Sequence, residues 1–517
     1  MRTSIEHMTT EPSPARGDWR AGLPDGVDRA SLPPIQAVQF DSRQVRAGDL
    51  FVCIPGERAD GHAFAAAAVQ AGAVALIALT GRGGEVAGLG VPVVEVADPR
   101  AVMASVAAAH EGYPARRMKV IGITGTDGKS TTAFLLHAAL SGCGLKTGLL
   151  TTIESKIGDR VLPNPTRLTS QEAPVVQRLL AEMLEAGCTH AVVEATSIGL
   201  DLHRLDHCAF DVAVFTNLTP DHLDFHGDLG KYRAAKGRLF ELLDDPARGK
   251  RRGTAVLNRD DPAWRYMASR TKARVVSYAL NDEEADITIE DLMLWTDGST
   301  FALSTGEESL EASVRMPGRF NVANAAAAIT AAAALGLNAM QAAAGVAACE
   351  GVPGRMQSIP GAPFTVIVDY AHTADALGKV VDTVRPAVEG RVIAVFGCAG
   401  ERGMERRTGL GAVAASVVDY SILTDEDPRS EASEAIIDDI ARAMLAGGAV
   451  EGEQFERIPD RRAAIDRALE IARPGDLVLL AGKGHETTIE YADGPRPWDD
   501  RAVARELIAN RFGGPPI

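Results

Sequence analysis

Residues 122–132 read GITGTDGKSTT, and this stretch decides the fold that the sequence predicts. It follows the strand-like run 119–121 and precedes a run with helical character over residues 133–140. Glycines allow backbone amides to close around phosphate oxygens, and the start of the following helix favours an anion. Lys129 can neutralise β- and γ-phosphate charge, and the Ser130 hydroxyl can bind Mg²⁺. The stretch therefore predicts a phosphate-binding loop that uses ATP or GTP.

The spacing of this loop is GxxGxxGKS, which differs from the GxxxxGK[ST] spacing of the common phosphate loop. A plain strand–helix turn with a chance lysine is the structural alternative, but the Gly-Lys-Ser order and both flanks favour a nucleotide site. The residues expected to contact the nucleotide are Gly125, Thr126, Asp127, Gly128, Lys129, Ser130 and Thr131.

The composition is that of a soluble globular protein, with 517 residues, 46% hydrophobic and 24% charged, and the length suggests about three domains. The formal net charge of −16 argues against non-specific binding to nucleic acid or to an anionic membrane surface. Six scattered cysteines without a CxxC pair fit a reducing cytoplasm. No apolar signal core and no run of about 20 apolar residues is present. We therefore expect a cytoplasmic monomer without membrane insertion or a nucleic-acid partner.

The pattern along the chain predicts an α/β protein of three domains behind a mobile tail at residues 1–30. Residues 31–117 form a small N-terminal α/β domain, 118–352 the central nucleotide domain, and 353–517 a Rossmann-like C-terminal domain. The expected central strands are 120–124, 191–194, 212–216 and 255–257, and those of the C-terminal domain are 364–368, 392–396, 420–424 and 477–480. Intervening helical stretches predict a doubly wound, mostly parallel central sheet. Residues 283–315 should form an antiparallel meander, followed by an alanine-rich helix at 324–334.

Two candidate metal ligands stand just beyond predicted central strands. Glu194 ends strand 191–194, and His222 follows strand 212–216. Because open α/β sheets bind ligands at the carboxyl ends of their strands, both should share an edge with the phosphate loop. With the Ser130 hydroxyl they could bind Mg²⁺, although histidine is an unusual ligand for magnesium. The structural alternative is that Glu194 caps a helix and His222 is a plain loop residue.

Lys236 is placed unusually for a lysine. Helical periodicity over residues 231–243 puts it inside an apolar stripe, one turn from both Tyr232 and Phe240. Burial there would lower its pKa, and a neutral amine could take up CO₂ as a carbamate, which is a metal-binding anion. From periodicity alone the favoured alternative is that the aliphatic stem packs while the ammonium reaches water.

From about residue 38 to the C-terminus the chain resembles the Mur ligases. The segments that carry this likeness are DSR (41–43), GDLFV (48–52) and DGH (60–62), similar to the uridine-nucleotide domain of the family; GTDGKST (125–131), similar to its ATP loop; and NLTPDHLDFHG (217–227) with AAKGRLF (234–240), close to the family signature. Asp127 stands where the family usually has asparagine. The resemblance implies that Lys236 carries a carbamate, that His222 and Glu194 bind two Mg²⁺, and that Ser42 belongs to the nucleotide-sugar site.

Later segments are similar to further nucleotide contacts of the family. LNRDD (257–261) implies that Asn258 contacts adenine, and VPGRM (352–356) with PGRFNVANAAAA (317–328) resembles the hinge, with Arg355 near phosphate. DYAHTADAL (369–377) implies that Asp369 and His372 also contribute to the nucleotide site. A helix start, a turn and a strand end would explain each segment singly, but their joint order is that of the family. The catalytic residues implied are Lys129, His222, Lys236 and Arg355.

The C-terminal domain should select the amino acid. GCAGERG (397–403), DEDPRSE (425–431) and GKGHE (482–486) each follow a predicted strand and should share one sheet edge. Arg429 can pair bidentately with a carboxylate, and Glu486 can hold an ammonium. In the family a DNPR motif accompanies meso-diaminopimelate; here Asp427 replaces the asparagine, which leaves lysine or ornithine open. Alternatively, Asp427 only caps the next helix. The expected amino-acid residues are Arg402, Asp427, Arg429, Gly482 and Glu486.

The segments expected to hold the muramoyl peptide depart from the family pattern. TSIGL (196–200) stands where SSHGL is common, so Ile198 removes a polar contact, and TSQ (169–171) replaces TTP. Arg204 is retained in register. The residues expected to bind the peptide are Thr169, Ser170, Thr196 and Arg204. Two alternatives follow: the contacts are rebuilt around the same acceptor, or the acceptor itself differs.

The resemblance implies ATP-dependent amide formation. The carboxylate of UDP-MurNAc-L-Ala-D-Glu would attack the γ-phosphate to give an acyl phosphate, and the amine of a free diamino acid would displace phosphate. One alternative is a related ligase that acts on another carboxylate, such as a folate or a polyamide chain; the uridine-type segment argues against it and Ile198 leaves it open. The other is a nucleotide-dependent switch, for which a carbamate has no evident use.

Overall fold

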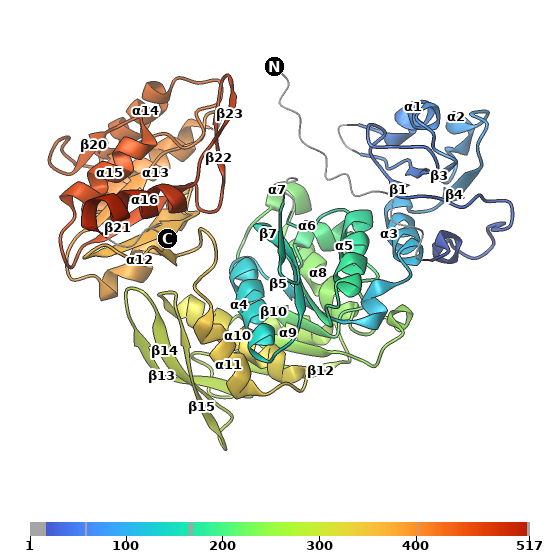
Figure 1. The fold of residues 1–517 in the computed structure, drawn as a ribbon, viewed down its shortest axis with the longest axis horizontal. Helices are drawn as coiled ribbons and strands as arrows, with labels where there is room; N and C mark the ends of the chain where they lie inside the picture. Colours follow the sequence, from blue (N-terminus) through green and yellow to red (C-terminus); the bar gives the residue numbers. More distant parts are fainter. Residues whose placement is uncertain (1–16, 57–58, 165–168, 402, 514–517) are drawn as a thin grey trace. The chain divides into compact units, whose positions relative to one another are not determined.

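The computed structural model describes residues 17–56, 59–164, 169–401 and 403–513. Two compact units divide the chain: the first combines residues 1–288 with 327–342, and the second combines 289–326 with 343–517. Each unit is an α/β structure built on parallel strands (Figure 1). This confirms the predicted fold class. None of the helices in the described ranges combines the length and the apolar character needed to cross a membrane.

The first unit begins with a small domain on a four-stranded parallel sheet of order β1-β2-β3-β4. Its elements are η1 (Trp19–Gly22), β1 (Val38–Gln39), β2 (Leu50–Val52), η2 (Gly61–Phe64), α1 (Ala65–Gln70), β3 (Ala75–Leu79), α2 (Gly83–Val86), β4 (Val93–Val96), α3 (Pro99–His110) and η3 (Pro114–Arg117). The prediction of a mobile tail over residues 1–30 is wrong for the second half of that range. Trp19 and Leu23 are buried in the core of this domain, and the Trp19 indole donates a hydrogen bond to the Pro33 carbonyl.

The rest of the first unit is built on the central sheet, in which parallel strands run in the order β12-β11-β10-β5-β9-β6 and antiparallel β7 and β8 follow. Its strands are β5 (Lys119–Thr124), β6 (Thr147–Leu150), β7 (Glu154–Ile157), β8 (Arg160–Pro163), β9 (His190–Glu194), β10 (Val212–Phe215), β11 (Thr254–Asn258) and β12 (Arg274–Ala279). Its helices are α4 (Lys129–Gly142), α5 (Ala173–Glu185), α6 (Ser197–Asp201), α7 (Leu223–His226), α8 (Leu229–Glu241), η4 (Pro246–Arg248) and α9 (Trp264–Ser269). The predicted parallel strands are all present.

Burial on both faces explains why these strands read as continuous apolar runs. Val120 packs in a core that includes side chains of α5, α8 and α9, whereas Ile121 and Ile123 on the same strand are buried outside that core. The sheet is therefore covered on both sides (Figure 1). Parallel register brings the ends of β5, β9, β10 and β11 to one edge, so the loops after them lie together.

The meander expected at residues 283–315 consists of three strands. They are β13 (Ile287–Leu294), β14 (Ser299–Ser304) and β15 (Ser309–Val314). β14 and β15 pair antiparallel, whereas β13 starts parallel to β12, with Ile287 opposite Tyr278. The alanine-rich helix is longer than expected: α10 spans Arg319–Ala334, and α11 spans Ala339–Ala348.

The C-terminal part of the second unit is a six-stranded sheet of order β16-β17-β21-β18-β19-β20, parallel except for β16. Its strands are β16 (Gln357–Ser358), β17 (Thr365–Asp369), β18 (Val392–Phe396), β19 (Tyr420–Leu423), β20 (Phe455–Arg457) and β21 (Leu477–Ala481), and β22 (Thr488–Tyr491) with β23 (Gly494–Pro497) forms a hairpin. Its helices are α12 (Ala374–Val384), η5 (Arg385–Ala387), α13 (Met404–Val417), α14 (Ser433–Ala446), α15 (Arg461–Ile471) and α16 (Asp500–Phe512). Separate cores under α12–α14 and under α15–α16 cover its two faces.

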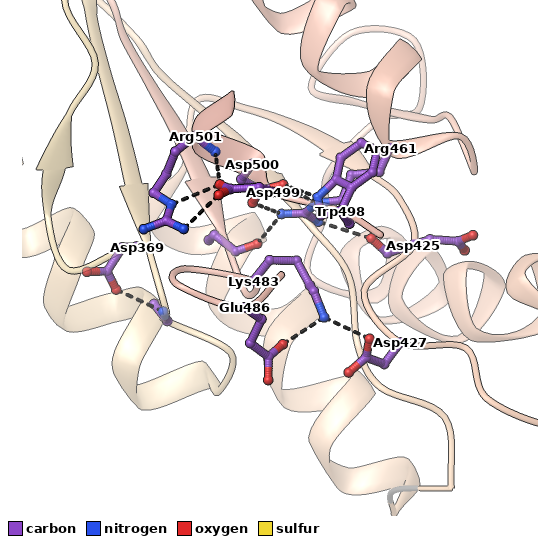
Figure 2. Close-up of polar contacts among 12 residues, drawn as sticks. Asp369, Asp425, Asp427, Arg461, Lys483, Glu486, Trp498, Asp499, Asp500 and Arg501 are labelled. Atoms are coloured by element: carbon purple, nitrogen blue, oxygen red, sulfur yellow. Dashed lines mark hydrogen bonds and ion pairs between the residues drawn. The ribbon is translucent and has the colours of Figure 1, made fainter. Parts of the chain in front are cut away.

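A buried ion pair ties α15 and α16 to the functional edge of this sheet. The side chains of Arg461 and Asp500 are both fully buried, and a guanidinium nitrogen lies 2.6 Å from a carboxylate oxygen. Arg461 also donates to the carbonyls of Asp425 and Ala481, which follow β19 and end β21 (Figure 2). The pair thus holds together the two strand ends that begin the predicted amino-acid segments.

We predict that Asp500→Ala strongly destabilises the second unit. Removing the carboxylate leaves a guanidinium buried without its counter-charge, and such a loss typically costs about 3–5 kcal/mol. The free energy of unfolding, measured by urea denaturation of the full chain, should fall accordingly. Asp493→Ala is the matched control, because Asp493 pairs with Arg496 on the surface; it should have no measurable effect. Equal effects of the two substitutions would contradict the role given to Asp500.

Candidate active site

The phosphate loop takes the conformation that its glycines allow. Gly128 has φ of 82°, and α4 begins at the next residue, Lys129. A Cβ on Gly125 would lie 1.8 Å from the Thr216 hydroxyl oxygen, so only glycine fits at this position. The backbone amides at the start of α4 therefore sit at the carboxyl end of β5, where an anion is favoured.

The loop that follows β10 holds the phosphate loop in place. The Thr216 hydroxyl donates to the Asp127 carbonyl (2.7 Å), and the Asn217 side-chain oxygen accepts from the Asp127 amide (2.8 Å). The Thr126 hydroxyl donates to the Thr219 carbonyl (3.0 Å). These contacts make the NLT segment at 217–219 a support for the glycine turn. Its sequence resemblance to the Mur ligases gave no hint of that role.

Ser130 and Glu194 form the oxygen-rich part of the site. The Ser130 hydroxyl lies 3.0 Å from both carboxylate oxygens of Glu194, which is 2% exposed. The amide and hydroxyl of Thr152 also donate to that carboxylate, at 3.1 and 3.2 Å. A carboxylate and a hydroxyl at this spacing are a donor set that suits Mg²⁺. The side chain of Glu194 therefore does not cap a helix, and the cap of α6 is Thr196.

Lys236 is buried beneath the glycine turn. The residue is 1% exposed, its Nζ donates to the Gly125 carbonyl at 2.6 Å, and Nζ lies 4.3 Å from the centre of the Tyr232 ring. The alternative in which the ammonium reaches water is therefore wrong. Burial, together with the nearby Lys129 ammonium, lowers the pKa of Lys236 well below its ordinary value. Lys129 itself donates to the Gly125 and Thr126 carbonyls, at 3.0 and 2.7 Å.

His222 is far more exposed than Ser130, Glu194 and Lys236. Its φ is 51°, half of its side chain is exposed (51%), and its Nε2 lies 3.4 Å from a carboxylate oxygen of Asp221. Within the described ranges, no three His, Cys, Asp or Glu side chains are grouped to hold a metal ion. The residues thus fit one Mg²⁺ at Ser130 and Glu194. A second ion would need an oxygen ligand that the Lys236 amine does not supply without a carbamate.

The residues expected at the muramoyl peptide form a hydrogen-bonded group next to Glu194. The Ser170 hydroxyl donates to the Glu194 carbonyl (3.1 Å) and lies 2.9 Å from the Thr196 hydroxyl. Thr169 joins through the Thr152 hydroxyl, whose oxygen lies 2.7 Å from the Thr169 hydroxyl oxygen. Part of this group lines a small pocket with Leu150 and Leu205. Ser42 lies in the small N-terminal domain, partly exposed, just after β1.

Arg204 is held by a residue that the sequence did not single out. Its guanidinium lies 2.7 Å from a Glu172 carboxylate oxygen and donates to the Ser170 carbonyl at 3.1 Å. Glu172 is 8% exposed and also contacts Arg100 at 3.5 Å. A lone glutamate before a helix carries no motif, so only the three-dimensional contact reveals it.

The other expected nucleotide residues are divided between the two units. In the first unit the side-chain amide of Asn258, at the end of β11, donates to the Thr216 carbonyl (2.7 Å). In the second, the Asp369 carboxylate accepts from the amides of Met356 (2.7 Å) and Ala371 (2.8 Å), and burial raises its pKa. The Arg355 guanidinium lies 4.9 Å from the centre of the Tyr370 ring.

Arg355 and His372 flank Tyr370. The Arg355 Nε is buried and has no hydrogen-bond partner among the residues described. The Nδ1 of His372 lies 2.8 Å from the Tyr370 carbonyl oxygen. A guanidinium with an unused buried donor is suited to an anion such as phosphate.

Two of the expected amino-acid residues, Asp427 and Glu486, meet at Lys483 after β19 and β21 of the second unit. The Asp427 carboxylate accepts from the Lys483 ammonium (2.7 Å) and from the Glu490 amide (2.9 Å) (Figure 2). Asp427 therefore does not cap α14, whose cap residue is Ala432. Arg429 has φ of 57°, and its guanidinium lies 3.9 Å from Glu401. Gly482, with φ of 105°, begins the turn that carries Lys483 and Glu486, and Arg402 lies outside the described residues.

Glu426 is a further buried acid of this region that the sequence did not single out. It is 5% exposed, and one of its carboxylate oxygens has no hydrogen-bond partner in the described part of the chain. Burial raises its pKa to about 7, although Arg406 and Lys483 act in the opposite direction. Its place before Asp427 in the DEDPR segment was the available signal.

Comparisons with known proteins cover nearly the whole chain. Residues 34–111 match the Mur ligase family catalytic domain, 123–332 the Mur ligase middle domain, and 354–484 the Mur ligase glutamate ligase domain. A UDP-N-acetylmuramyl-tripeptide synthetase of Roseiflexus sp. (strain RS-1) is 46% identical over 93% of this chain and 96% of its own length. A UDP-N-acetylmuramoyl-L-alanyl-D-glutamate–2,6-diaminopimelate ligase of Halalkalibacterium halodurans is 41% identical over 93% and 96%.

A solved structure agrees with this relationship. The structure of a UDP-N-acetylmuramoyl-L-alanyl-D-glutamate–2,6-diaminopimelate ligase is 32% identical, with a TM-score of 0.69 over 95% of this chain and 97% of that chain. The chain therefore belongs to the Mur ligase family.

We predict that Lys236→Met stabilises the nucleotide-free protein near neutral pH. Because burial depresses the pKa of Lys236, the unfolded chain binds more protons than the folded one between that depressed value and about 10.5. The wild-type protein should therefore gain stability as the pH rises through this window, and Lys236→Met should not share that gain. Thermal unfolding of both proteins from pH 7 to 10 in CO₂-free buffer measures the difference in their stability, which should become smaller as the pH rises.

Lys231→Met is the matched control for this experiment. Lys231 lies on the same helix, α8, but 73% of its side chain is exposed. Its substitution should leave the pH dependence of stability unchanged. If the stability difference between Lys236→Met and wild type grows with pH, the lowered pKa of the Lys236 amine is contradicted.

Proposed function

We propose that this chain is an ATP-dependent ligase that adds a diamino acid to UDP-MurNAc-L-Ala-D-Glu during the synthesis of peptidoglycan precursors. The observation that carries the proposal is the grouping of Ser130, Glu194 and Lys236 around the glycine turn in a full-length member of the Mur ligase family. The relatives named for this reaction match over nearly their whole length. The diamino acid is meso-diaminopimelate, lysine or ornithine.

The first step makes an acyl phosphate on the central domain. An oxygen of the D-glutamate carboxylate attacks the γ-phosphorus of ATP, the bond to the bridging oxygen breaks, and ADP leaves. The amides of the glycine turn bind the phosphates, and Lys129 moves from the Gly125 and Thr126 carbonyls to the phosphate charge. When bound at Ser130 and Glu194, Mg²⁺ would neutralise phosphate oxygens and polarise the γ-phosphoryl group. Ser170, Thr196 and Arg204 orient the peptide that carries the carboxylate.

Lys236 has the chemistry required for a carbamate. Its buried amine has a lowered pKa, so a share of it is neutral and can attack the carbon of CO₂, losing a proton as the carbamate forms. The change replaces a cation beneath the glycine turn by an anion. That anion would relieve the repulsion from Lys129. Its oxygens would also be ligands for a second Mg²⁺, together with His222.

The second step uses the C-terminal domain. The α-amine of the incoming amino acid attacks the acyl carbon, phosphate leaves, and the amine loses a proton. Arg429 is suited to a carboxylate of the amino acid, while Asp427 and Glu486 are suited to its ammonium group. Arg355, with its unused donor, is suited to phosphate oxygens. The reaction is thus mostly positioning and charge neutralisation.

The proposal predicts sustained ADP release only when both the acceptor and an amine that displaces phosphate are present. UDP-MurNAc-L-Ala-D-Glu would be supplied with ATP, Mg²⁺ and, separately, meso-diaminopimelate, L-lysine or L-ornithine. One of the three amino acids should stimulate ADP release strongly. Lys129→Ala should lower the rate by at least about a hundredfold, because the ammonium that neutralises the phosphate charge is lost. ADP release that does not depend on the muramoyl dipeptide would contradict the assignment of the acceptor. An active Lys129→Ala enzyme would contradict the assignment of the phosphate loop.

Carbamate chemistry makes a separate prediction for Lys236→Ala. The variant should be almost inactive but should regain part of its activity in acetate or another short carboxylate, which can occupy the vacated space as an anion. The rate of ADP release with increasing acetate checks this. Absence of any recovery in a folded Lys236→Ala protein would count against the carbamate.

A further inference from the structure

Lys483, which was not predicted to belong to the amino-acid site, is buried between two acids that were. Its side chain is 1% exposed, and its Nζ lies 2.7 Å from an Asp427 oxygen and 2.7 Å from a Glu486 oxygen. Figure 2 shows the ammonium between the two carboxylates, one on each side. One buried cation is therefore shared by two acids that the sequence placed in the amino-acid site.

The backbone around Lys483 leaves it little freedom to move. Both neighbours, Gly482 and Gly484, have positive φ (105° and 51°). A Cβ on Gly484 would approach the Tyr370 Cβ to 2.7 Å, and a Cβ on Gly354 would lie 2.0 Å from the Gly484 carbonyl carbon. The turn is thus packed directly against the segment that carries Arg355 and Tyr370. The turn therefore fixes the backbone of Lys483, and the contacts with Asp427 and Glu486 fix its ammonium.

Stability alone is a poor reason for this arrangement. Taking a lysine and two carboxylates out of water is costly, and apolar side chains of similar volume often stabilise a protein at least as well. The Asp427 oxygen that Lys483 contacts also accepts the Glu490 amide at 2.9 Å. One oxygen of Asp427 is therefore fully occupied, which fixes the direction of its second oxygen. One oxygen of Glu486 accepts from the same ammonium.

We propose that Lys483 is a positioning residue that holds Asp427 and Glu486 in the geometry that receives the ammonium group of the incoming diamino acid. One lysine between two carboxylates leaves a single net negative charge, which matches one substrate ammonium. Without Lys483 the two carboxylates would repel each other, turn apart or take up protons, and the substrate would lose its paired acceptors. This inference rests on the proposed ligase function.

The test separates binding of the amino acid from activation of the acceptor. Lys483→Met would be compared with wild type in ADP release, using the amino acid of the panel above that gives the highest rate. The KM for that amino acid should rise at least about tenfold, a factor equivalent to about 1.4 kcal/mol. The kcat and the KM values for ATP and UDP-MurNAc-L-Ala-D-Glu should stay within about twofold. A merely structural loss would lower kcat or move all three KM values.

Hydroxylamine distinguishes failure of this inference from failure of the proposed function. It attacks the acyl carbon of an acyl phosphate, releases phosphate and leaves a hydroxamate, without using the amino-acid site. Wild type and Lys483→Met should form hydroxamate at similar rates from ATP and UDP-MurNAc-L-Ala-D-Glu. No hydroxamate from the wild-type enzyme would overturn the ligase mechanism. Normal hydroxamate together with a wild-type KM in Lys483→Met would overturn only the role of Lys483.

Two further variants complete the design. Lys379→Met is the matched control, because Lys379 lies on α12 of the same unit with 61% of its side chain exposed; it should behave as wild type. Lys483→Gln keeps N–H donors without the charge and is the second variant if Lys483→Met does not fold. It should show the same rise in the KM for the amino acid. If neither variant folds, Lys483 is a structural residue and the proposal is wrong.

Discussion

The contact between the Lys236 ammonium and the Gly125 carbonyl is the constraint on which the site depends. Two lysines, Lys129 and Lys236, donate to this one carbonyl oxygen, and the second of them is buried. Like charges held together in a poorly solvated place destabilise a fold, and that cost is typical of functional sites rather than of cores. The cost is consistent with a site made to receive negative charge, whether from phosphate or from a carbamate.

The same principle recurs in the second unit with the opposite sign. There the carboxylates of Asp427, Glu486 and Glu426 gather around Lys483, and burial raises the pKa of Glu426. This group of acids is suited to an additional positive charge, as the glycine turn is suited to an anion. The two ends of the proposed reaction, an ATP-activated carboxylate and an incoming amine, thus correspond to local charge imbalances within an otherwise acidic chain.

Local patterns predicted much of this arrangement, and the limits of the prediction have physical causes. Apolar runs located the parallel strands, and glycines with Lys129 and Ser130 located the phosphate loop, because these depend on neighbours in sequence. Periodicity predicted that Lys236 lies on the apolar face of its helix. It could not predict how deeply the side chain is buried, because that depends on Gly125 from another segment. The contacts of Glu172 with Arg204 and of Lys483 with Asp427 join residues far apart in the chain, so no local pattern revealed them. Trp19 was assigned to a tail because one aromatic residue among prolines and charges gives no periodicity.

Carbamate formation on Lys236 can be observed by ¹³C NMR. The full-length protein would be equilibrated with ¹³C-bicarbonate, with and without Mg²⁺ and a non-hydrolysable ATP analogue, beside Lys236→Met treated in the same way. The wild-type protein should give a single carbamate resonance that Mg²⁺ and the analogue strengthen and that Lys236→Met lacks. A wild-type spectrum without that resonance under all these conditions, or the same resonance in Lys236→Met, would contradict carbamate formation on Lys236.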